Sequence, residues 1–129
     1  MPTNRPPGSV VIKHITEDID QVFADSLLAV ASSHLGSAVQ VLHRVSWGVR
    51  YDVDNWSVLA LVVSGSYAAL VEHRCSLDTP ASVEVKVFPL ANINSFSVHE
   101  DRATISVLGF DSPVPLPTGT LASELFNIR

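Results

Sequence analysis

Hydrophobic and polar side chains alternate along residues 39–51, and this is the clearest pattern in the chain. The apolar positions are Val39, Val41, Val45, Trp47 and Val49, and the polar positions between them include Gln40, Arg44, Ser46 and Arg50. A period of two residues is typical of a β-strand that buries one face and exposes the other. Similar runs recur up to Leu108, so we expect most of the chain to build one curved antiparallel sheet.

Residues 56–63 predict a strand in the centre of the sheet, because they are apolar on both faces. Ser64-Gly65 is expected to form the hairpin loop that follows, with Gly65 at positive φ, and residues 66–74 are expected to return. Gly48 lies late in the preceding strand and is expected to mark a bulge or bend.

Residues 82–88 alternate between valine and polar side chains, which predicts another half-buried strand. Val83, Val85 and Val87 are expected to face inward, and Ser82, Glu84 and Lys86 outward. Pro89 should end this ladder, since proline has no N–H to donate.

The last part of the chain predicts a hairpin, an extended segment and a helix. Residues 94–99 and 102–108 pair around a turn at Glu100-Asp101. Prolines at 113, 115 and 117 exclude a central strand, so residues 111–118 are expected to form an edge or linker. Residues 121–128 predict a short terminal helix.

One long amphipathic helix is predicted over residues 16–35. Its apolar stripe consists of Ile19, Val22, Phe23, Leu27 and Val30, at steps of three and four residues. Thr16 is expected to cap the N-terminus, and Gly36 follows His34 as a C-terminal cap. The stripe needs an apolar surface to cover, and the sheet is the one that the sequence predicts.

These elements predict an α+β fold. With a first strand over residues 10–15, about seven strands form a mainly antiparallel, strongly curved sheet or partly open barrel. One N-terminal amphipathic helix and a short C-terminal helix complete it. Residues 1–9 are Pro-rich and are expected to form a flexible arm, and residues 10–129 a single domain.

The composition of the chain narrows the expected cellular location and the expected classes of binding partner. The 129 residues carry a net charge of −5 with scattered basic residues, which disfavours nucleic-acid binding. No signal-peptide pattern is present, and no apolar run reaches the roughly 20 residues of a membrane span. A single cysteine, Cys75, favours a reducing, cytoplasmic location. The 47% hydrophobic content indicates apolar surface that is buried against another chain.

Four residues are candidates to line a ligand site: His43, Trp47, Tyr51 and Trp56. His43 shares the apolar phase of its strand, and the two tryptophans flank the turn at residues 52–55. For His43 the plainer interpretation is a core histidine with one hydrogen bond, and for the tryptophans it is a place in the core or an interface.

His73 and Cys75 are the one pair with nucleophile chemistry, because they share a face if their strand continues. A catalytic thiolate also needs an orienting group, and the sequence assigns none. No set of residues has the spacing of a metal site or a phosphate loop. The sequence therefore predicts no catalytic residue, no metal and no cofactor.

The hairpin over residues 57–71, SVLALVVSGSYAALV, joins two apolar strands through a tight turn, and VFPLANI at residues 87–93 leads through a Pro-Leu step into the next hairpin. Over about residues 39–129 these features resemble the bacterial pleckstrin-homology-like (PH-like) domains, which have seven strands and a helix that plugs an open barrel. The long N-terminal helix departs from that pattern. The resemblance implies a protein-interaction module from a bacterial or phage source. The loop matching the phosphoinositide-binding loop, residues 52–55, is acidic, which disfavours a lipid headgroup.

The expected function is therefore a non-catalytic protein-interaction or assembly module that associates with itself or with another protein. The alternative is a small-molecule-binding protein or enzyme with a pocket between helix and curved sheet, as in cystatin-like folds and those of the nuclear transport factor 2 type. His43, Trp47 and Tyr51 would line such a pocket. A lipid-headgroup binder ranks last because of the acidic loop.

Overall fold

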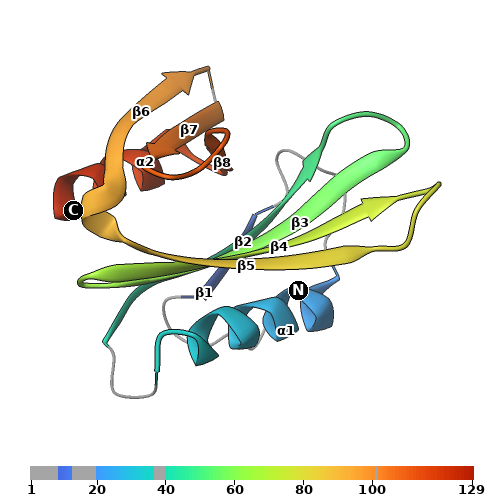
Figure 1. Ribbon diagram of the computed structural model, residues 1–129, viewed down its shortest axis with the longest axis horizontal. Helices are drawn as coiled ribbons and strands as arrows, with labels where there is room; N and C mark the ends of the chain where they lie inside the picture. Colours follow the sequence, from blue (N-terminus) through green and yellow to red (C-terminus); the bar gives the residue numbers. More distant parts are fainter. Residues whose placement is uncertain (1–8, 13–19, 37–39, 101) are drawn as a thin grey trace.

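Two β-sheets and two α-helices make up the described part of the protein (Figure 1). A computed structural model describes residues 9–12, 20–36, 40–100 and 102–129. The expected arm lies outside these ranges apart from Ser9, as do residues 13–15 of the expected first strand. The α+β class and the mainly antiparallel pairing are confirmed.

Five strands form the large sheet in the order β1-β2-β3-β4-β5. They are β1 (Ser9–Ile12), β2 (Val41–Arg50), β3 (Asn55–Ser64), β4 (Tyr67–Ser76) and β5 (Ser82–Pro89). β1 pairs parallel to β2, and the other pairs are antiparallel. β3 is central, as its apolar faces predict.

Three strands form the small sheet in the order β6-β7-β8. They are β6 (Ile93–His99), β7 (Arg102–Val107) and β8 (Val114–Leu116). The predicted hairpin of β6 and β7 is confirmed by their antiparallel pairing up to His99 and Arg102, and Glu100 has a φ of 56°. The proline-rich segment contributes β8 as a short strand beside β7, which agrees with an edge position.

The prediction of one strongly curved sheet or partly open barrel is wrong, because the chain leaves the large sheet at Pro89. The 3₁₀ turn η1 (Leu90–Asn92) follows, and its first residue Leu90 and the next residue after it, Ile93, are buried. The N–H of Leu90 donates to the carbonyl of Ser66 at 2.9 Å, which ties the turn to the β3–β4 hairpin. The next strands therefore stack over the large sheet instead of extending it.

The main core lies between the two sheets and α2 (Gly119–Ile128). Its members from the large sheet are Val45, Trp47, Val49, Leu59, Leu61, Val63, Ala68, Leu70 and Phe88, and from the rest Leu90, Ile93, Ala103, Ile105, Val107, Val114, Leu116, Leu121, Ala122 and Leu125. Val45, Trp47 and Val49 face this core as predicted, but Val41 is 41% exposed and Ser46, on the predicted outer face, is fully buried. Gly48 pairs regularly with Val58, and the irregularity in β2 lies instead between Val41 and His43.

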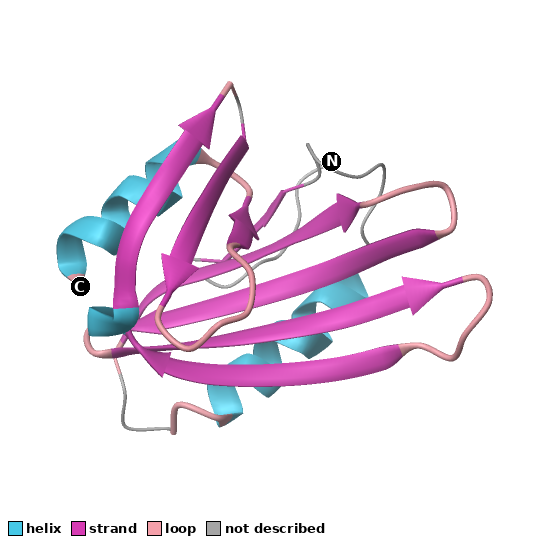
Figure 2. Cartoon of the chain, turned by 45° about the horizontal axis from the view of Figure 1, so that its top comes forward, coloured by secondary structure: helices cyan, strands magenta, loops and turns pink. Residues whose placement is uncertain are grey.

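The second core lies under α1 (Gln21–Ser33), on the opposite face of the large sheet (Figure 2). Its buried members are Leu27, Leu28 and Ala31 of α1 with Ala60, Val62, Ala69 and Val71 of the sheet. The packing of these side chains joins α1 to the large sheet.

The helix differs from its prediction in its start and in its buried stripe. It begins at Gln21 because the Asp20 carboxylate accepts the N–H groups of Val22 and Phe23 at 2.9 and 3.2 Å. Thr16, the expected cap, lies outside the described residues. Val22 is 76% exposed and Val30 38%, and alanines are buried instead. Small side chains let the helix approach the sheet closely. It ends at Ser33, two residues earlier than predicted, with His34 as C-cap in place of Gly36, which follows at a φ of 89°.

The β3–β4 hairpin turns one residue later than expected, at Gly65-Ser66. Ser64 Oγ accepts the N–H groups of Ser66 and Tyr67 at 3.1 and 2.8 Å and donates to the Tyr67 carbonyl at 2.8 Å. This side chain closes the turn, so Gly65 does not need the positive φ that the sequence predicted.

β5 is a strand as predicted, but its valine face is not buried as predicted. Val83 is 57% exposed and Val87 47%, and Val85 alone packs at the rim of the helix core. α1 packs mainly over β3, with β4 and β2, so no helix of the described residues covers most of this face of β5. The terminal helix is confirmed, with Thr118 as its cap, although Ile128 is 38% exposed.

Candidate functional site

The four predicted ligand residues do not line one pocket. Trp47 is fully buried between the sheets, and its Nε1 has no hydrogen-bond partner among the described residues. Trp56 belongs to the opposite face, where the Arg50 guanidinium lies 5.7 Å from its ring. His43 contacts Glu124 of α2, with Nε2 3.4 Å from Oε2. Tyr51 lines a polar cleft.

A polar cleft lies where the large sheet extends past the small sheet. Its cavity volume is about 90 Å³, and its walls are Tyr51, Leu59, Leu70, Glu72, Arg74, Lys86, Phe110, Ser112, Pro113, Val114 and Pro115. Strands β3 to β5 and Tyr51, directly after β2, supply the floor, and the segment between β7 and β8 with the first residues of β8 supplies the opposite wall. The same two-residue period that buries Leu59 and Leu70 also directs the polar side chains into this space.

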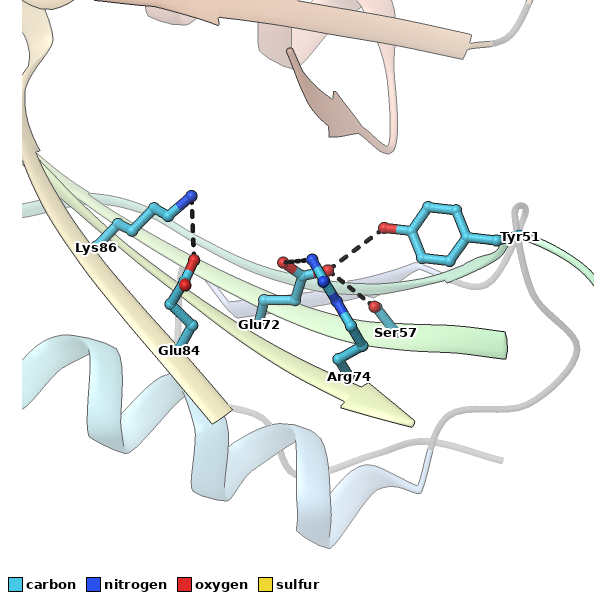
Figure 3. Close-up of polar contacts among 6 residues, drawn as sticks. All are labelled: Tyr51, Ser57, Glu72, Arg74, Glu84 and Lys86. Carbon is cyan, nitrogen blue, oxygen red and sulfur yellow. Dashed lines mark hydrogen bonds and ion pairs between the residues drawn. The ribbon is translucent and has the colours of Figure 1, made fainter. Parts of the chain in front are cut away.

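Glu72 is the residue on which the polar contacts of Tyr51, Ser57 and Arg74 converge (Figure 3). Its Oε2 accepts the hydroxyls of Ser57 at 2.8 Å and Tyr51 at 3.3 Å, and its Oε1 lies 3.3 Å from Nη2 of Arg74. The Glu72 side chain is 16% exposed and that of Arg74 65%. The carboxylate thus has three donors, and the guanidinium has no second hydrogen-bond partner among the described residues.

Burial raises the pKa of the Tyr51 phenol above its ordinary value of 10.0, and the nearby charge of Glu72 adds to that rise against the opposing hydrogen bond from Ser57. At neutral pH Tyr51 is therefore a hydroxyl donor and not a base. The cleft offers hydrogen-bond donors and charge for a polar ligand.

His73 and Cys75 do share a face, because β4 continues to Ser76. Their Nδ1 and Sγ atoms are 3.1 Å apart, on the α1 side of the sheet, and the His73 ring lies edge-on to Phe23. Burial raises the pKa of the Cys75 thiol, so this environment does not generate a thiolate at neutral pH. The described residues contain no group of three or more His, Cys, Asp or Glu that could hold a metal ion.

The outer edge of β5 is the second candidate site. No other strand of the described ranges pairs with this edge. Alternate backbone N–H and C=O groups of an edge strand point away from the sheet and can pair with another strand. Glu84 and Lys86 lie on the cleft side of β5, 3.0 Å apart, with side chains that are 61% and 42% exposed. The valines lie on the other side.

Sequence reasoning missed Glu72, Arg74 and Ser57. A signal for them exists: all three are polar residues that interrupt apolar strands in the phase of the main core. Within one strand such an interruption is ambiguous. The pairing of Leu59 with Glu72 and of Ser57 with Arg74, which a single sequence does not give, brings the three together.

Comparisons of the chain with protein-family models, with curated proteins and with solved structures gave no match. The resemblance to PH-like domains therefore stays a prediction. No helix in the described ranges is long and apolar enough to cross a membrane.

Proposed function

We propose that this protein is a non-catalytic assembly module that associates with itself. The observation that carries the proposal is the free edge of β5, where a strand with an exposed valine face lies at the border of the large sheet. Exposed edge strands pair readily with other strands, and native proteins usually shorten, bulge or cover them. This edge is eight residues long.

Two further features support the proposal. The chain is 47% hydrophobic, and the exposed valines of β5 account for part of this surplus. The single cysteine agrees with a reducing, cytoplasmic setting. The resemblance to PH-like interaction domains agrees with a protein partner.

The test is the solution mass by light scattering over about a hundredfold dilution, a range that spans the transition of a micromolar dimer. We expect an oligomer that dissociates on dilution, and Val87→Lys should shift the transition to higher concentration. Val53→Lys is the matched control, because Val53 is 81% exposed in a turn far from the edge. A monomer at every concentration contradicts the proposal.

Binding of a small polar ligand in the cleft is the second candidate function, and the convergence of Tyr51, Glu72 and Arg74 favours it. Because the free donors belong to Arg74, small carboxylates and phosphates are the first ligands to screen by thermal shift. We expect Arg74→Ala to abolish any stabilisation, and Arg102→Ala, at the exposed start of β7, to preserve it. A ligand that stabilises both variants equally binds elsewhere.

A further inference from the structure

We propose that two copies of the chain pair antiparallel through β5, about a two-fold axis at Val85, and so join two large sheets into one. This inference rests on the proposed self-association and names its interface. A two-fold arrangement uses the same edge twice and closes on itself, so it gives a dimer and not a fibre.

The charges of β5 fit this register. With Val85 opposite Val85 of the partner subunit, Glu84 lies opposite Lys86 of the partner subunit, and the reverse pair forms by symmetry. Residues directly opposite in an antiparallel pair share a face of the sheet, with Cβ atoms about 4.5–5.5 Å apart. Each Glu84–Lys86 pair, which now spans 3.0 Å within one strand, can thus also form across the interface.

The same charges disfavour the neighbouring registers. A shift of two residues in one direction places Glu84 opposite Glu84 of the partner subunit, and a shift in the other direction places Lys86 opposite Lys86 of the partner subunit. Like charges directly opposite each other destabilise strand pairs. A shift of one residue brings the valine face of one copy against the charged face of the other. Of these registers, the pairing about Val85 is the one that places Glu84 opposite Lys86 of the partner subunit and keeps the valines of both copies on one face.

The valines add the apolar part of the interface. In this register Val83 lies opposite Val87 of the partner subunit, and both positions are about half exposed in the single chain, at 57% and 47%. The six valines of the two strands then form one strip on the α1 side, in which the two copies of Val85 lie at the rim of the helix core and Val83 and Val87 are more exposed. Figure 2 shows β5 as the outermost strand of the large sheet, with its outer edge free of other elements in the described ranges.

Charge exchange tests the register. Glu84→Lys alone creates two Lys–Lys pairs and Lys86→Glu alone two Glu–Glu pairs, so each should raise the dissociation constant about tenfold or more. The double variant E84K/K86E restores opposite charges and should dimerise like the native chain. A mixture of the two single variants should form the heterodimer. Circular dichroism verifies that each variant is folded, which we expect because both side chains are exposed.

A cysteine on the axis provides an independent test. In a Cys75→Ser background, Val85→Cys places two thiols across the axis, where Cα atoms about 4.5–5.5 Å apart suit a disulfide. Oxidised glutathione takes the two electrons and two protons of the thiols, and two molecules of reduced glutathione leave. Val83→Cys is the matched control, since its own copy lies four positions along the strand and should not cross-link.

The outcomes separate the two proposals. The register is wrong if the dissociation constant of the dimer is the same in both charge variants as in the native chain, or if a cross-link forms at residue 83 and not at residue 85. Either result still agrees with self-association. A native chain that is monomeric at all concentrations overturns both. Charge-dependent dimerisation with rescue in the double variant, together with a cross-link at residue 85, supports both.

Discussion

Strands β2 and β5 have almost the same pattern of apolar and polar residues in the sequence, but they differ in how far the structure buries their apolar faces. Val45, Trp47 and Val49 of β2 are all below a tenth exposed, but Val83 and Val87 of β5 are about half exposed. Both strands alternate apolar and polar residues, and both were expected to bury the apolar face. The difference is what lies over that face: the small sheet and α2 cover β2, and α1 stops short of β5.

An alternating pattern therefore identifies a strand with one apolar face, but it does not show which part of the protein covers that face. At an interior strand the cover comes from the same chain. At an edge strand the valines remain available for a second chain, and the unpaired backbone groups of the edge add hydrogen bonds. For this protein the exception to the burial rule is therefore the feature that carries the proposed function.

The largest expected effect is that of Trp47→Ala, which should lower the free energy of unfolding by about 3–5 kcal/mol because it empties a fully buried site. Val87→Ala in β5 should change the stability of the monomer by less than about 0.5 kcal/mol. Urea unfolding at a concentration where the chain is monomeric measures both. Similar losses at the two positions refute the distinction between the strands.

The next effect compares two glutamates on the same face of the sheet. Glu72→Ala should cost about 1–3 kcal/mol, because it leaves the hydroxyls of Ser57 and Tyr51 and the Arg74 guanidinium without their acceptor. Glu84→Ala is the matched control and should cost less than about 0.5 kcal/mol, because its ion pair is exposed. Equal costs mean that the cleft network adds nothing to the fold.

A smaller effect concerns the turn that sets the register of β3 against β4. Ser64→Ala removes one donor and one acceptor of the hairpin and should cost about 1 kcal/mol. Ser66→Ala, at the exposed tip of the same turn, should be close to neutral. Denaturant unfolding of the two variants checks this, and an equal loss contradicts the role given to the Ser64 side chain.

The smallest effect is a pH dependence from Tyr51. The pKa of its phenol is raised in the folded protein, so between its ordinary value of 10.0 and the raised value the unfolded chain binds fewer protons than the folded one. Stability should therefore fall as the pH rises above 10.0 and level off above the raised pKa. Tyr51→Phe should fall less steeply over this window. Melting temperatures measured across it test the sign, and parallel curves for the two proteins contradict it.

Local signals were enough for the elements whose contacts are close in sequence. Four predicted features each depend on a few neighbouring residues. They are the apolar phase of β2, the proline that ends β5, the hairpin of β6 and β7, and the short C-terminal helix. The start of α1 was misplaced because Thr16 and Asp20 are both good caps, and propensity does not choose between them. The buried stripe of the helix was misjudged because alanines, which carry a weak hydrophobic signal, make the closest contacts.

The sequence by itself determined that this chain forms an α+β protein of alternating strands with two helices, because strand and helix periods are local properties. Only the tertiary structure decided that the strands divide into two stacked sheets, that Glu72, Arg74 and Tyr51 meet in one cleft, and that β5 is an edge strand with no partner among the described strands. Each of these facts depends on which strands pair and in which register. Pairing joins residues far apart in the chain, and a single sequence does not specify those contacts.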